Sequence, residues 1–127
     1  MLSSPEVEAL AAHEIGHEYV WAEYERAIRL GDRDRTKELE LMCDAIAIAT
    51  LHRLGLDPSR LMSGLEKISR FNRDRFGTAL NEGNYPTLAE RRAFARKVRD
   101  WLSRAVAAPI AAAPTDSPAT AAGPPPR

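Results

Sequence analysis

Apolar residues return every three or four positions along most of the first hundred residues, and this period is the strongest constraint on the fold. A period of 3.6 residues predicts amphipathic helices, and no segment shows the convincing alternation that a strand requires. The 127 residues suffice for one domain with a modest core. We therefore expect an all-α domain of about four helices over residues 1–104, without strands.

The first predicted helix extends from about residue 5 to residue 30. Ser4 suits its N-cap and Pro5 its first helical position, while Gly31 and Asp32 break the pattern at the other end. The inner stripe of this helix comprises Leu10, His13, His17, Val20 and Tyr24. Two of the three histidines of the chain are thus expected on one helix face.

The second predicted helix covers about residues 36–54 and ends at Gly55. Its inner stripe comprises Leu39, Glu40, Cys43, Asp44, Ala47 and Leu51. The carboxylates of Glu40 and Asp44 could belong to an exposed charged face, but the apolar residues around them favour burial.

Two further helices are predicted before the composition changes. Asp57 and Pro58 open the third helix, which is followed by a loop over residues 72–85, and the capping-box sequence Thr87–Glu90 opens the fourth. The buried face of the third helix is predicted to be Leu61, Leu65, Ile68 and Phe71. That of the fourth is predicted to be Phe94, Val98, Trp101 and Leu102. Residues 105–127 are dominated by Ala, Pro, Ser and Thr, so we expect a disordered tail.

Charge and composition exclude several classes of protein. The 18 basic residues equal the 18 acidic ones, so the chain has no electrostatic footprint for nucleic acid or an anionic membrane. One cysteine excludes an intrachain disulfide. No signal peptide or membrane-length apolar stretch is visible, which favours a cytoplasmic protein unless a preceding segment carries a targeting signal.

Residues 13–17 read His-Glu-Ile-Gly-His on a predicted helix. Side chains four residues apart share one helix face, with Cβ atoms about 5–6 Å apart, so His13 and His17 can reach one metal ion. Glu14 is offset by one position, from which its carboxylate can act as a general base without ligating the metal. Gly16 allows another element to approach closely. A chance pentapeptide on a solvated helix is the alternative, but the helical period and apolar flanks favour a zinc site.

A zinc site of this kind needs a third protein ligand, for which Glu40 and His52 are the candidates. Glu40 is favoured because it lies on the inner stripe, whereas His52 lies three turns further along. Asp44, one turn after Glu40, is expected to accept the free ring N–H of a ligand histidine, with His13 the expected donor. We expect Cys43 to serve in packing, the commoner role of a free cysteine in a helix.

Taken together, these motifs resemble the gluzincin metallopeptidases that include the CAAX prenyl proteases and the HtpX-like heat-shock proteases. The segments that carry the resemblance are His13–His17, Glu40–Asp44 with Ala47, Leu54–Pro58 and Tyr85–Arg91. The resemblance spans about residues 9–98, and the order of the segments is more specific than any one motif. It implies a zincin-like helical core, with Zn²⁺ held by His13, His17 and Glu40.

The chain departs from that family in two respects. Tyr85 stands where the family has a histidine that helps to bind the reacting carbonyl oxygen. A tyrosine hydroxyl can also donate to an oxyanion, so this carbonyl-binding role is either kept by Tyr85 or lost. Pro86, Glu90 and Arg91 are expected to form a turn, a cap and a pair with an acidic partner. The family also has a strand before its catalytic helix, which receives the substrate as an added strand. The residues before His13 predict helix, so we expect a chain truncated at its N-terminus, whose substrate platform is missing or comes from a partner chain.

The expected function is therefore that of a zinc-dependent metalloendopeptidase, which hydrolyses a peptide or protein substrate with a zinc-activated water. Glu14 and Tyr85 are the expected catalytic residues. The alternative is a zinc-binding helical fragment or partner subunit without proteolytic activity of its own.

Overall fold

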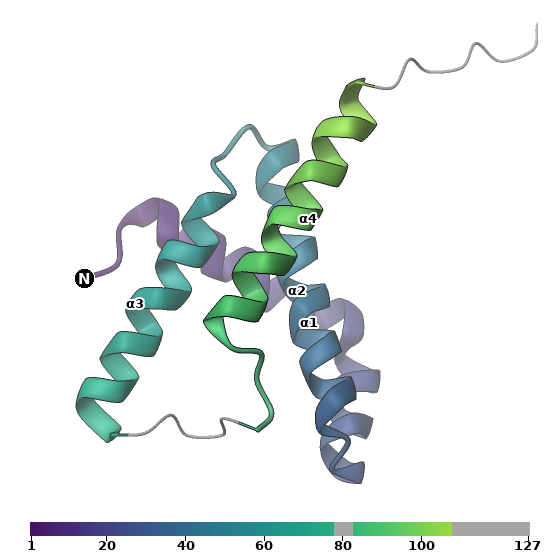
Figure 1. Ribbon diagram of the computed structural model, residues 1–127, viewed down its shortest axis with the longest axis vertical. Helices are drawn as coiled ribbons and strands as arrows, with labels where there is room; N and C mark the ends of the chain where they lie inside the picture. The colour runs from purple at the N-terminus through teal and green to yellow at the C-terminus, as the bar shows by residue number, and fades with distance from the viewer. Residues whose placement is uncertain (78–82, 108–127) are drawn as a thin grey trace, which may run out of the picture.

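Four helices make up the computed structural model, which describes residues 1–77 and 83–107 (Figure 1). They are α1 (Ser4–Leu30), α2 (Arg33–Arg53), α3 (Ser59–Phe76) and α4 (Leu88–Ala107). The described residues contain no strand, so the prediction of an all-α fold with about four helices is confirmed. No helix within these residues is long and apolar enough to cross a bilayer.

The α1–α2 pair is the most extensive helix–helix contact of the structure. A short turn joins the two helices, in which Gly31 has a φ of 65°, a left-handed conformation that glycine adopts without steric cost. The Asp32 side chain then accepts a hydrogen bond from the Arg35 backbone N–H at 3.0 Å. Because Asp32 caps the helix, α2 starts at Arg33, three residues before the predicted start.

Two apolar clusters stabilise the packing of the helices. The larger one lies where the first half of α1 meets α2, α3 and α4, and consists of Ala9, Ala12, Ala47, Ile48, Leu51, Leu61 and Ala95. The smaller one lies between the second half of α1 and the first half of α2, and consists of Val20, Ala27, Leu39 and Cys43. The inner stripe predicted for the second helix is buried at all six positions.

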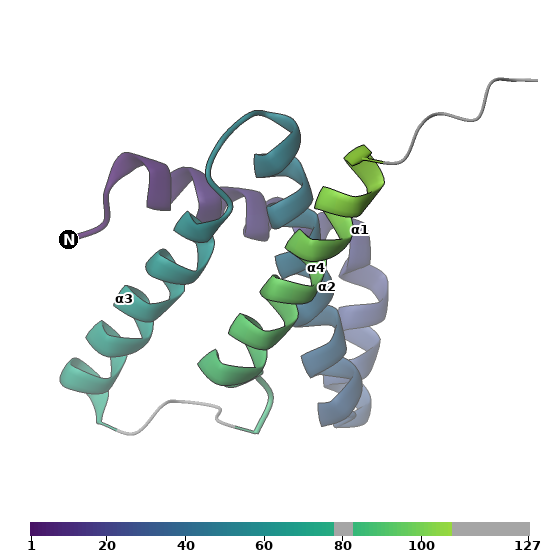
Figure 2. The same ribbon diagram turned by 45° about the horizontal axis from the view of Figure 1, so that its top comes forward.

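The α3 and α4 helices run in opposite directions beside each other, with the first half of α1 passing close to α3 (Figures 1 and 2). The predicted faces of these two helices are only partly right. Leu61 is buried, but Ile68 is 37% exposed, Phe71 60% and Trp101 65%. The helical period identifies the face that could be buried, but it does not say how far along that face a neighbouring helix extends.

The helix ends also differ from the predictions in part. The cap of α1 is Ser3 rather than Ser4, because the Glu6 carboxylate accepts the Ser3 backbone N–H at 2.7 Å. The predicted capping box of α4 is confirmed: Thr87 N–H donates to Glu90 at 2.6 Å, and Glu90 N–H donates to the Thr87 hydroxyl at 3.1 Å.

The predicted loop and tail begin too early. Since α3 continues to Phe76, the first five residues of the predicted loop over 72–85 are helical. Since α4 continues to Ala107, the tail predicted from residue 105 cannot start before residue 108. Residues 78–82 of that loop and residues 108–127 of that tail lie outside the described part of the chain.

Candidate metal centre

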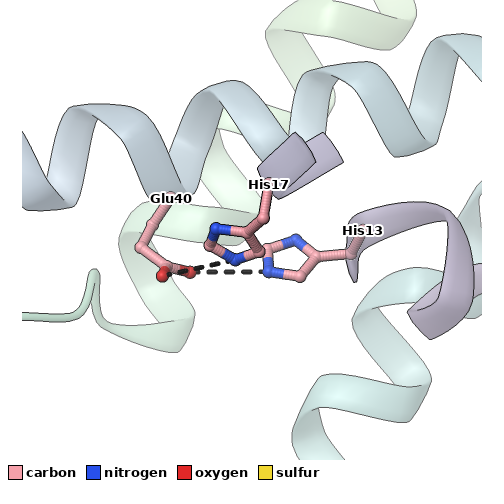
Figure 3. Close-up of side chains that lie close together, drawn as sticks. All are labelled: His13, His17 and Glu40. Atoms are coloured by element: carbon pink, nitrogen blue, oxygen red, sulfur yellow. Dashed lines mark ion pairs between the residues drawn. The ribbon is translucent and has the colours of Figure 1, made fainter. Parts of the chain in front are cut away.

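Three potential metal ligands converge between α1 and α2 (Figure 3). One ligand atom each of His13, His17 and Glu40 lies within 4.8 Å of the other two. The Nε2 atom of His13 is 3.5 Å from one Glu40 oxygen, and the Nε2 atom of His17 is 3.6 Å from the other. Ligand atoms about 2.0–2.1 Å from a tetrahedral zinc ion are about 3.3 Å apart. Each histidine lies near this spacing from a different Glu40 oxygen, and the three ligand atoms lie within 4.8 Å of one another.

The local structure of α1 explains how the two histidines come to face the same point. They are four residues apart on one helix, and their rings meet edge to face with centroids 5.0 Å apart and an interplanar angle of 83°. His13 is buried and His17 is partly exposed. One ligand is therefore enclosed, while the other borders solvent.

Gly16 explains how α2 comes close enough to supply the third ligand. A Cβ atom added at Gly16 would lie 3.0 Å from the Cα of Cys43 and 3.2 Å from its carbonyl oxygen. A side chain here would therefore press on the backbone of α2 itself, as expected for a glycine at a close helix crossing. The same contact buries Cys43, whose predicted packing role is confirmed. Burial, and then the carboxylates of Glu40 and Asp44, raise the pKa of this thiol to about 12.

Asp44 lies directly behind the first histidine, but the predicted hydrogen bond from the His13 ring is not formed. Its Oδ1 is 2.9 Å from the Nδ1 of His13, although the ring N–H is not directed well enough at this oxygen for a hydrogen bond. Burial lowers the pKa of His13, but Asp44 and Glu40 outweigh this effect and raise the pKa to about 9. Asp44 and Glu40 therefore favour a positive charge next to them in the buried cluster.

Arg91 joins both carboxylates from α4. Its guanidinium donates to Asp44 at 2.7 Å and to Glu40 Oε2 at 2.9 Å, and all three side chains are buried. The sequence predicted an acidic partner for Arg91, and the structure identifies two. The Tyr85–Arg91 segment is thereby connected to the Glu40–Asp44 motif of α2.

Tyr24 holds the other oxygen of the same carboxylate. Its hydroxyl donates to Glu40 Oε1 at 2.9 Å, and its ring meets that of His17 edge to face with centroids 5.0 Å apart. Burial, then Glu40 and then the neighbouring Tyr85 raise the pKa of Tyr24 above its ordinary value. The helical period predicts Tyr24 on the inner stripe, but it does not predict this polar role. The available signal was its position seven residues, or two turns, after His17.

The other predicted site residues lie at the edge of the cluster or away from it. Glu14 is exposed on α1, next to His13 in the chain. Tyr85 is 41% exposed and lies beside Tyr24. His52, the alternative third ligand, is exposed in the last turn of α2 and does not belong to the cluster.

Comparison of the sequence with models of protein families gives no match, and neither do comparisons with curated proteins and with solved structures.

Proposed function

We propose that this chain is a zinc metalloendopeptidase of the gluzincin type, related to the CAAX prenyl protease and HtpX-like family. The observation that carries the proposal is the convergence of His13, His17 and Glu40, with Glu14 next to the first ligand. These residues form the donor set that catalytic zinc sites use: two imidazole nitrogens and one carboxylate oxygen. The pairing of Arg91 with Glu40 and Asp44 supports the relationship, because it joins two of the resembling segments in space.

The charges at the cluster also fit a cation. Glu40 and Asp44 contribute two buried negative charges, which Arg91 and a protonated His13 balance in the metal-free chain. Buried charges are costly unless they are balanced, and a metal ion held by Glu40 and the two histidines would take the place of the His13 proton as the second positive charge. In such a site Asp44 would orient His13, as carboxylates behind ligand histidines commonly do.

Bound zinc would supply a Lewis acid that activates a water molecule and polarises a peptide carbonyl group. Glu14, exposed and one residue from a ligand, would accept a proton from the attacking water and deliver it to the leaving amine. Tyr85, at the edge of the cluster, would donate its hydroxyl proton to the developing oxyanion. The proposed substrate is a peptide or protein segment, and the proposed place of action is the cytoplasm.

A zinc-binding helical subunit without proteolytic activity is the second candidate. The observation that favours it is that residues 1–77 and 83–107 include no strand to which a substrate could add by β-pairing. Under this candidate a partner chain would supply the substrate platform, and cleavage would appear only in the complex.

Metal analysis together with a cleavage assay separates these candidates. We expect the purified chain to bind one zinc per molecule, and we expect chelation to abolish cleavage of casein or a peptide library. Glu14→Gln should keep the zinc but lose cleavage by roughly 100-fold or more. Zinc binding without cleavage would favour the subunit, whereas absence of zinc would eliminate both candidates. Glu40→Ala should lose the zinc, and unchanged zinc affinity in that variant would remove Glu40 from the ligand set.

The two tryptophans provide an independent readout of metal position. Trp21 lies four residues after His17, about 6 Å along α1, whereas Trp101 lies ten residues after Arg91, about 15 Å along α4. Both are well exposed, at 57% and 65%. Co²⁺ bound at the proposed site should quench Trp21 in a Trp101→Phe variant more strongly than Trp101 in a Trp21→Phe variant.

A further inference from the structure

Glu40 is held by a separate donor on each of its two oxygens. Arg91 of α4 donates to Oε2 at 2.9 Å, and Tyr24 of α1 donates to Oε1 at 2.9 Å. The two histidines face the same oxygens, with His13 3.5 Å from Oε2 and His17 3.6 Å from Oε1. The carboxylate is therefore fixed from both sides in an orientation that faces the two imidazoles.

Tyr24 differs from an ordinary packing residue in two respects. Its hydroxyl donates a hydrogen bond to a buried carboxylate rather than to solvent. Its ring packs edge to face on His17 with an interplanar angle of 82°. One side chain thus touches two of the three proposed ligands. It lies on α1, where His17 is, and reaches Glu40 on α2, so it also ties the two helices together at the cluster.

We propose that Tyr24 is a positioning residue of the metal centre, which orients the Glu40 carboxylate and restrains the ring of His17 for metal binding. This inference rests on the proposed zinc site. Tyr24 does not ligate the metal; it reduces the freedom that Glu40 would lose when a metal binds. Groups that hydrogen-bond to metal ligands in this way commonly change metal affinity by 10- to 100-fold when they are removed.

The test compares zinc affinity in three proteins by competition with a chromophoric chelator: wild type, Tyr24→Phe and Tyr19→Phe. Phenylalanine at position 24 keeps the ring that packs on His17 and removes only the hydroxyl. We expect Tyr24→Phe to bind zinc roughly 10- to 100-fold more weakly than wild type. Tyr19 is on the same helix but 77% exposed, so Tyr19→Phe should bind zinc as wild type does.

A second measurement uses the unaltered chain and does not depend on a variant folding. With tyrosine labelled at the ring Cζ, the chain gives three tyrosine NMR signals. Addition of one equivalent of Zn²⁺ should shift the Tyr24 signal and leave the Tyr19 signal in place. A wild-type chain that binds zinc without any shift at Tyr24, or a Tyr24→Phe variant that binds zinc as tightly as wild type, would overturn the inference and leave the zinc site standing. A wild-type chain that binds no zinc would instead overturn the proposed function, and this inference with it.

Discussion

The two halves of the molecule use their helix faces differently. Along α1 and α2, the inner stripes pack against neighbouring helices and include polar groups. Glu40, Asp44 and His13 are all buried. Along the second half of α3 and the end of α4, apolar side chains such as Phe71 and Trp101 stay exposed. A buried charge must be satisfied by specific partners, whereas an exposed apolar side chain needs none. The α1–α2 half is therefore held by paired buried charges. The second half of α3 and the end of α4 depend on a few small contacts.

The largest effect that would test this contrast is expected at Arg91. Arg91→Met should cost roughly 3–5 kcal/mol of unfolding free energy in metal-free protein, because it leaves two buried carboxylates without their cation. Arg92 is the matched control, since it pairs with Glu66 at the surface and Arg92→Met should cost less than about 1 kcal/mol. Urea unfolding with excess chelator measures both. Equal losses in the two variants would contradict the contrast between the halves.

Apolar truncations give the next largest effect. Leu39 is fully buried between α1 and α2, so Leu39→Ala should cost roughly 2–5 kcal/mol. Phe71 is 60% exposed on α3, and Phe71→Ala should stay within about 1 kcal/mol despite the larger side chain that is removed. Thermal or urea unfolding of the two variants measures both losses of stability. A Phe71→Ala cost as large as that of Leu39→Ala would show that the far end of α3 is covered in solution.

Gly16 gives a smaller effect that concerns the spacing of α1 and α2. Alanine should gain up to about 1 kcal/mol in helix propensity, but pressing on the Cys43 backbone should cost roughly 1–3 kcal/mol. We therefore expect Gly16→Ala to be mildly destabilising and to weaken zinc binding, because it separates the helices that carry the proposed ligands. Gly64 is the control: its nearest contact is the flexible side chain of Leu10, at 3.2 Å, so Gly64→Ala should leave zinc binding unchanged.

The smallest expected effect is a pH dependence at the contact of α1 with α3. Glu6 is buried there and accepts hydrogen bonds from Lys67, Ser3 and Ser63, and these contacts, that with Lys67 foremost, hold its pKa below the ordinary 4.5. A carboxyl group whose pKa is lower in the folded state stabilises the fold above pH 4.5, and this contribution is lost as the pH falls toward the folded value. Glu6→Gln should therefore have a lower free energy of unfolding than wild type at pH 7, and this difference should narrow as the pH falls. Urea unfolding of both proteins across pH 3–7 measures this difference. A difference of the same size at pH 3 and pH 7 would exclude titration of Glu6 as its cause.

The sequence predicted the first half of the molecule better than the second for a physical reason. The positions of His13, His17, Glu40 and Asp44 follow from helical periods within two adjacent helices joined by a short turn. The exposure of Ile68 and Phe71 depends on where α1 ends its contact with α3, which no local pattern records. The hydroxyl contact of Tyr24 was not predicted for a related reason. A tyrosine that faces inward gives the same helical period whether it only packs or also donates a hydrogen bond.

The two donors on Glu40 have a consequence for the order of events during folding. The hydrogen bond from Tyr24 spans 16 residues of sequence and the one from Arg91 spans 51. The three proposed ligands lie on α1 and α2, but the second donor to Glu40 is in place only when α4 has docked, and an unfolded chain would present scattered ligands. A metal ion would then select the finished tertiary structure by mass action. Metal affinity would then report the docking of α4 through Arg91, although α4 itself carries no ligand.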